Sequence, residues 1–155
     1  MKNKQKKIAL YTSPHLISLC ERLRINDEPV SEEILNRALL KVKEAALKEN
    51  ISPTYFETLT VAAFLICKEQ GIEVLVAEAG LGGRFDATAV AKGTLTVLTS
   101  IGLEHTAILG DSEEKSLLEK LGIMQRETHL VHFPLTEKLS LTLNKFKEEK
   151  GINIV

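Results

Sequence analysis

The segment that decides the fold is residues 72–90, which read IEVLVAEAGLGGRFDATAV. Its first six residues form an apolar run of the kind found in strands buried on both faces of a parallel sheet. The loop that follows contains three glycines, but Phe85 stands where a G-x-G-x-x-G dinucleotide pattern needs its third glycine. The chain also contains no Gly-Lys-Ser/Thr tripeptide, with which a triphosphate-binding P-loop ends. The segment therefore predicts a buried strand leading into a loop that does not by itself wrap a triphosphate.

The composition is that of one globular domain. The chain has 155 residues, of which 44% are hydrophobic and 26% charged, enough for a sizeable core. A formal net charge of −1 argues against non-specific binding to nucleic acid or to an anionic membrane surface. No stretch approaches the roughly 18 apolar residues of a membrane span, and the apolar run near the basic start is too short for a secretory signal. Cys20 and Cys67 form no C-x-x-C pair, so we expect a reduced, cytoplasmic protein without nucleic-acid or membrane partners.

Apolar runs and helical patterns follow one another along the chain. Ser31 is expected to be the N-cap of one helix, and Thr54 and Glu57 have the spacing of a capping box at the start of another. The expected helices cover residues 31–50, 54–71, 111–121 and 139–150, and the expected strands cover residues 7–12, 72–77, 95–101, 129–133 and 152–155. This order predicts an α/β fold with a mostly parallel sheet flanked by helices. Because no linker divides the chain, residues 1–155 are expected to form a single domain, with residues 1–7 as a basic tail.

Four polar residues follow expected strands or lie on the helix beyond them: Ser13, Glu78, His105 and Lys120. In an open parallel sheet, ligands bind in the crevice outside the carboxyl ends of the strands. Serine, glutamate and histidine supply the oxygen and nitrogen ligands that suit a divalent cation carrying phosphate oxygens and water. A second interpretation stays open here, because a turn-capping serine, polar loop residues and a solvated helix lysine would leave the same pattern.

Five segments together resemble the folylpolyglutamate synthase/dihydrofolate synthase family of Mur-type amide ligases. They are YTSPHL (11–16), ERLRIN (21–26), EAGLGGRFDAT (78–88), TSIGLEHTAILGD (99–111) and EKLGI (119–123). The resemblance covers residues 8–125 well and residues 126–155 weakly. It implies the fold of a truncated Mur-ligase central (ATPase) domain, without the P-loop and the C-terminal domain of the family.

The resemblance also implies a reaction and its cofactors. In that family, ATP phosphorylates a substrate carboxylate and the amine of glutamate attacks the acyl phosphate, with magnesium ions neutralising charge on the phosphoryl group. By resemblance, Ser13, Glu78 and His105 match the magnesium ligands. Lys120 matches a lysine that the family carries carbamylated. The expected catalytic residues are therefore Lys120 and His105, and the expected metal ligands are Ser13, Glu78, His105 and Lys120. The implied small-molecule substrates are dihydropteroate or a folate, glutamate and ATP.

Two further segments match the family's dihydropteroate pocket, and Arg84 lies beside the second. An aromatic ring that stacks on a pterin and an acid that binds its amino-pyrimidine edge make chemical sense. For Phe56, core packing at helical spacing is an equal alternative, and Arg84 is either a bidentate carboxylate binder or an ordinary surface arginine. The implied substrate-binding residues are Thr54, Tyr55, Phe56, Glu57, Arg84, Phe85, Asp86 and Ala87.

Departures from the family pattern lead to two hypotheses about function. The family's phosphate-binding segment is expected before the strand at residues 7–12, Ala89 stands where the family usually has Asn, and EKLGI replaces the common EKAGI. On the first hypothesis, the chain is the central part of a folate-type ligase, inactive alone and completed by a fragment that carries the P-loop. On the second, it is a noncatalytic remnant or small folate- or metal-binding module. A fragment of a Mur-type peptidoglycan ligase is a weaker alternative, against which SPHL together with GGRFDAT argues.

Residues 1–155, purified alone, are expected to show no useful ATP affinity. The physical reason is that the backbone N–H groups and the lysine of a Gly-Lys-Ser/Thr loop are what hold the phosphates. Isothermal titration with Mg-ATP tests this expectation. A micromolar dissociation constant would mean that the phosphate-binding loop has been misidentified.

Overall fold

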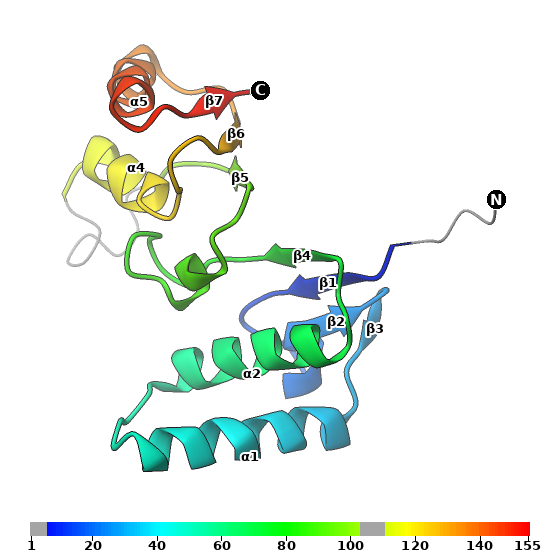
Figure 1. The fold of residues 1–155 in the computed structure, drawn as a ribbon. Helices are drawn as coiled ribbons and strands as arrows, with labels where there is room; N and C mark the ends of the chain where they lie inside the picture. Colours follow the sequence, from blue (N-terminus) through cyan, green and yellow to red (C-terminus); the bar gives the residue numbers. More distant parts are fainter. Residues whose placement is uncertain (1–5, 103–110) are drawn as a thin grey trace. The chain divides into compact units, whose positions relative to one another are not determined.

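The computed structural model describes residues 6–102 and 111–155 (Figure 1). The chain divides into two compact units, Met1–Ala79 and Gly80–Val155. The expectation of a single domain stays a prediction.

The first unit contains a four-stranded sheet in the order β3-β2-β1-β4. Its strands are β1 (Ile8–Tyr11), β2 (Leu23–Ile25), β3 (Glu28–Pro29) and β4 (Val74–Ala77). β1 and β4 are parallel, as expected, with Ile8 opposite Val74 and Tyr11 opposite Ala77. The antiparallel β2–β3 hairpin was not predicted from the sequence, because its strands are only three and two residues long.

The turn of this hairpin is Asn26-Asp27, two residues with φ of 49° and 70°. A two-residue loop with both φ values positive matches the right-handed twist of hairpin strands, and Asn and Asp tolerate that conformation. The Asn26-Asp27 dipeptide is a sequence signal for a hairpin turn, but no strands were expected beside it.

Two helices, α1 (Glu32–Lys48) and α2 (Tyr55–Glu69), lie side by side on one face of this sheet (Figure 1). The Ser31 side chain accepts a hydrogen bond from the N–H of Ile34, and Thr54 and Glu57 form the expected capping box. Both predicted caps are confirmed. The core between helices and sheet is built from small and branched side chains around one tyrosine: Ala9, Tyr11, Leu23, Val30, Leu35, Ala38, Val42, Ala62, Ala63 and Ile66.

In its described residues, the second unit contains a parallel sheet in the order β5-β6-β7 and the helices α4 and α5. The elements are β5 (Leu95–Leu98), α4 (Glu113–Leu121), β6 (His129–His132), α5 (Glu137–Lys150) and β7 (Asn153–Ile154), and the 3₁₀ helix η2 (Ala87–Ala91) precedes β5. Its core gathers apolar residues of β5, α4, β6 and α5 and of the connections between the elements: Leu98, Leu117, Leu121, Met124, Leu130, Leu139, Leu143, Phe146 and Ile152. The predicted α/β class with mostly parallel strands flanked by helices is confirmed. None of the helices described is long and apolar enough to cross a membrane.

The first sheet leaves apolar side chains in water on the face that α1 and α2 do not cover. Alternate residues of its parallel pair are exposed there: Ile8, Leu10, Val74 and Val76. β4 is also an edge strand of this sheet. An edge strand with exposed apolar side chains and unpaired N–H and C=O groups is a template for pairing with another chain.

We therefore expect the 155-residue chain to self-associate and to melt at a low temperature. Val76→Lys places a charge on β4 at a side chain that is 54% exposed, so it should shift the chain toward monomer. Leu40→Lys on the exposed surface of α1 is the control and should not. Sedimentation velocity with thermal melts measures both effects, and a monodisperse unmutated monomer with a sharp transition at high temperature would contradict the expectation.

Candidate functional site

The carboxyl ends of β1 and β4 meet at one edge of the first sheet, and two of the expected metal ligands meet there. The Ser13 N–H donates to Oε2 of Glu78 at 2.8 Å. The Glu78 N–H donates to the carbonyl oxygen of Tyr11, the last residue of β1, at 2.9 Å. Because the two strands are parallel, the segments that follow them leave the sheet at the same edge. This brings together Ser13 and Glu78, which are 65 positions apart in the sequence.

The donor set at this edge suits a hard divalent cation. A serine hydroxyl and a carboxylate are the oxygen ligands that Mg²⁺ takes together with water and phosphate oxygens. His105 lies outside the described residues, and within residues 6–102 and 111–155 no three His, Cys, Asp or Glu side chains gather as a metal cluster. The metal site stays a prediction.

Arg22 and His15 belong to the same edge, although the sequence suggested no role for either. Arg22 ends the 3₁₀ helix η1 (Leu19–Arg22), and its carbonyl oxygen accepts the N–H of Thr12 at 2.9 Å. Its Nε donates to Nδ1 of His15 at 3.0 Å, and its Cζ lies 5.5 Å from the centre of the Tyr55 ring. Both residues lie in segments that resemble the family, His15 in SPHL and Arg22 in ERLRIN. The resemblance itself assigned no role to either side chain.

Glu21 holds the loop between Ser13 and η1. Its carboxylate accepts the backbone N–H groups of Leu16 at 3.0 Å, Ser18 at 2.9 Å and Ile17 at 3.5 Å. The hydrogen bond from Leu16 and then that from Ser18 lower the pKa of Glu21. The clamped loop presents Leu16 and Ile17 to solvent, each 92% exposed.

The four residues expected to bind substrate at the start of α2 divide into two pairs. The Thr54 hydroxyl accepts the N–H of Glu57 at 3.2 Å, and the Glu57 carboxylate accepts the N–H of Thr54 at 2.7 Å. The hydrogen bond from the Thr54 backbone N–H is the main cause of the lowered pKa of Glu57. Phe56 packs against the core with its ring 6.2 Å from that of Tyr11, as the core-packing alternative requires. Tyr55 is exposed. Substrate binding by all four stays a prediction.

In the second unit, Asp86 organises the glycine-rich loop from within. Its Oδ2 accepts the N–H groups of Gly80 and Leu81 at 2.8 and 2.9 Å, and its Oδ1 accepts the N–H and hydroxyl of Thr88 at 2.9 and 2.5 Å. Only 8% of Asp86 is exposed. The acid expected to meet a pterin therefore has four contacts that shape its own loop, which is why Asp and Thr stand two residues apart in GGRFDAT.

The same loop lies against the end of α4. A Cβ on Gly83 would be 2.3 Å from the carbonyl oxygen of Lys120, and a Cβ on Gly122 would be 2.6 Å from Cβ of Arg84. The Arg84 N–H donates to the carbonyl of Glu119 at 3.0 Å, and its Nε lies 3.8 Å from that residue's carboxylate. GGRF and EKLG are thus two halves of one packing contact in which only glycine fits at positions 83 and 122.

The remaining expected residues lie around this contact. Lys120 is partly buried in the last turn of α4. Phe85 is 89% exposed, and Ala87 begins η2. Arg84 pairs with Glu119 of its own unit, and carboxylate binding by it stays a prediction.

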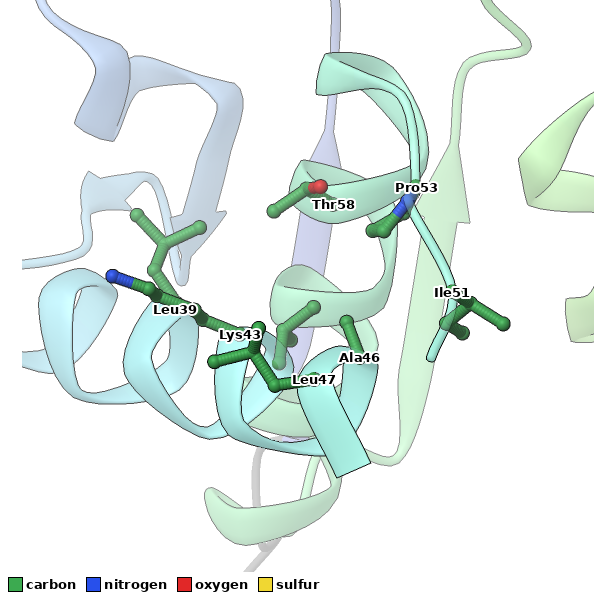
Figure 2. A pocket seen from close by; sticks show the side chains of 8 residues that line it. Leu39, Lys43, Ala46, Leu47, Ile51, Pro53 and Thr58 are labelled. Carbon is green, nitrogen blue, oxygen red and sulfur yellow. The ribbon is translucent and has the colours of Figure 1, made fainter. Parts of the chain in front are cut away.

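An apolar groove of about 410 Å³ lies between α1 and α2 (Figure 2). Its lining combines aliphatic side chains with one lysine and one threonine: Leu39, Val42, Lys43, Ala46, Leu47, Ile51, Pro53 and Thr58. None of the expected site residues lines it. Binding sites usually add several convergent polar groups to an apolar lining, and the sheet edge meets that description better than the groove.

Comparison with known proteins agrees with the resemblance seen in the sequence. The dihydrofolate synthase/folylpolyglutamate synthase of Buchnera aphidicola subsp. Schizaphis graminum is 39% identical over 119 residues, which are 77% of this chain and 28% of that protein. The structure of E. coli FolC in complex with DHPP and ADP superposes with a TM-score of 0.88 at 34% identity, over 96% of this chain and 35% of that one. A bifunctional folylpolyglutamate synthase/dihydrofolate synthase from Yersinia pestis, complexed with AMPPNP and Mn ion, gives a TM-score of 0.83 at 30% identity. No family model matches the chain.

The fold is therefore that of part of a protein with the Mur-ligase fold. More particularly, the chain belongs to the folylpolyglutamate synthase/dihydrofolate synthase family. It spans a little over a quarter of the length of the curated relatives it matches.

Gly83→Ala is expected to destabilise the second unit by about 1–3 kcal/mol, because the new methyl group meets backbone atoms that cannot rotate away. Gly93→Ala is the matched control, since its Cβ would meet only the carbonyl of Leu95 at an ordinary 3.6 Å. Urea unfolding followed by a second-unit amide signal measures the difference. Equal stability of the two variants would contradict the contact.

The Glu21 clamp should depend on pH. Its pKa is lowered in the folded state, so the stabilisation is complete above the ordinary pKa of 4.5 and is lost as the pH falls through the folded value. Amide hydrogen exchange of Leu16 and Ser18 should therefore lose its protection in acid, and in Glu21→Gln it should already be reduced at pH 7. Protection that is the same from pH 7 to pH 3 would contradict the clamp.

Proposed function

We propose that this chain forms the cation- and folate-binding part of an ATP-dependent ligase that adds glutamate to dihydropteroate or to folates. The observation that carries the proposal is the Ser13–Glu78 pair at the carboxyl edge of β1 and β4. It is supported by relatives named for these two activities and by related structures whose names include ADP, DHPP, AMPPNP and a Mn ion.

The reaction follows from the poor electrophilicity of a carboxylate. The substrate carboxylate attacks the γ-phosphorus of ATP, the bond to ADP breaks and an acyl phosphate forms. The amine of glutamate then attacks the acyl carbon, inorganic phosphate leaves, and the amide forms as the amine loses a proton. Most of the rate enhancement in phosphoryl transfer comes from positioning and charge stabilisation, so the protein's task is to hold charged groups in place.

The residues of this chain divide that task between them. Ser13, Glu78 and His105 would hold Mg²⁺, with Lys120 completing the set if it is carbamylated into an anion. When bound, the cation neutralises charge on the transferring phosphoryl group. The folate end would meet Thr54, Tyr55, Phe56 and Glu57 in the first unit, and Arg84, Phe85, Asp86 and Ala87 in the second. The proposal requires a Gly-Lys-Ser/Thr loop from outside residues 1–155, in the same polypeptide or in a complementing fragment.

The test is an assay of ATP- and glutamate-dependent dihydrofolate formation, with the P-loop segment of a relative supplied separately. Glu78→Gln should lower the rate by about 100-fold or more, because it replaces a charge-bearing cation ligand with a neutral one of equal size. Glu28→Gln, on exposed β3, is the control and should leave the rate unchanged.

Two results would count against the proposal. A rate for Glu78→Gln within a few-fold of the unmutated pair would remove Glu78 from the cation site. Dihydropteroate binding without any turnover in the complemented assay would favour the noncatalytic binding module instead.

A further inference from the structure

We propose that Arg22 is a substrate-anchoring residue that binds a carboxylate of the acidic substrate at the carboxyl edge of the first sheet. The inference rests on the proposed function, since it assigns a further residue and a chemical group to the same site.

The chain path places Arg22 at this edge. β2 runs antiparallel to β1, so the residue before β2 lies where β1 ends. The Thr12 N–H donates to the Arg22 carbonyl, and the next residue, Ser13, donates its N–H to Glu78. Because Thr12 and Ser13 are adjacent, these two hydrogen bonds bring the backbone of Arg22 and the carboxylate of Glu78 to the same part of the edge.

Two contacts hold the guanidinium without neutralising it. Its Nε–H donates to His15 at 3.0 Å, and one face lies over the Tyr55 ring with Cζ 5.5 Å from the ring centre, within cation–π range. A guanidinium has five N–H donors, and the contact with His15 uses one. Across the described parts of the chain, the four N–H groups on Nη1 and Nη2 have no hydrogen-bond partner and the charge has no acidic partner.

Two acids, one next to Arg22 in sequence and one on the helix of Tyr55, are already engaged elsewhere. Glu21, its neighbour in sequence, spends its carboxylate on three backbone N–H groups of the loop. Glu57, at the start of the helix that carries Tyr55, is half of a capping box. A partly buried cation without a counter-ion favours an anionic ligand, and the planar fork of a guanidinium matches the two oxygens of a carboxylate.

The surroundings favour a carboxylate on an organic framework over a free phosphate. The loop that holds His15 also carries Leu16 and Ile17, both almost fully exposed, and the exposed Tyr55 ring lies beside the guanidinium. An aromatic ring against the cation, with exposed apolar side chains on the loop that holds His15, suits an aryl or acyl carboxylate, whose carbon skeleton gains from leaving water.

The experiment titrates the 155-residue chain with p-aminobenzoylglutamate, which carries carboxylates but no pterin. We expect Arg22→Ala to weaken its binding by about tenfold or more, the loss expected for hydrogen bonds to a charged group. Arg24→Ala, an exposed arginine two residues further along β2, is the matched control and should bind as the unmutated chain does. In the unmutated chain, the Arg22 Nε–H resonance should shift on titration, a readout that does not depend on the folding of any variant.

Two further ligands separate the possible outcomes. Inorganic phosphate should bind the Arg22 site more weakly than p-aminobenzoylglutamate, and equal or tighter binding would overturn the carboxylate assignment. 6-Methylpterin carries no carboxylate, so its affinity should be the same for the unmutated chain and Arg22→Ala.

The inference and the proposed function fail in distinguishable ways. Equal affinity of Arg22→Ala and the unmutated chain for p-aminobenzoylglutamate, an unmoved Arg22 resonance, or no binding of this ligand overturns the inference. Failure of 6-methylpterin to bind, while p-aminobenzoylglutamate still binds through Arg22, counts against the pterin assignment and leaves Arg22 in place. The turnover assay with Glu78→Gln tests the ligase function independently of both.

Discussion

The first unit depends on the parallel pairing of β1 and β4. Four residues of each strand pair in register, and the connection between them carries the β2–β3 hairpin and both helices of the unit. A parallel pair requires a long crossover, and helices in that crossover cover one face of the sheet. The same pairing makes both strands end at one edge, so the amide of Ser13 meets the carboxylate of Glu78. Core, helix packing and candidate site are thus consequences of a single pairing of strands.

The short hairpin adds a second constraint at that edge. Its turn residue Asn26 exchanges hydrogen bonds with Ile8 at the start of β1, and the antiparallel pairing of β2 with β1 then places Arg22 beside the end of β1. The loop between β1 and η1 has few backbone partners of its own, and Glu21 supplies them. The N–H group of Ser18 is partly buried, where a missing partner would be costly, so a carboxylate three residues beyond it stabilises the loop. Several polar residues of the conspicuous motifs have this kind of structural task.

Asp86 shows the same competition in the second unit. Its acid, expected from the family resemblance to face a ligand, has both oxygens engaged by the backbone and side chains of its own loop. The loop in turn approaches the end of α4 so closely that residues 83 and 122 have no room for a Cβ. The exposed aromatic ring of Phe85 is the group that this rigid loop presents to solvent. In this motif, the buried residue Asp86 holds the loop in shape, and the exposed residue Phe85 is free to contact other molecules.

The sequence by itself determined the main helices and strands, the α/β class and the family. The signals sufficient for these predictions were the continuous apolar runs, the caps at Ser31 and Thr54, and the motifs EAGLGGRFDAT and YTSPHL. Each of them is local, because it depends only on residues that are neighbours in the sequence. Only the tertiary structure decided which polar side chains bond within their own loop, as those of Asp86 and Glu21 do, and which keep hydrogen-bond donors without a partner in the described residues, as the guanidinium of Arg22 does. It also decided that Arg22, His15 and Tyr55 belong together. Their contacts join an arginine before one strand to an aromatic ring on a helix 33 positions away, and no local pattern encodes a pairing that depends on the antiparallel return of β2.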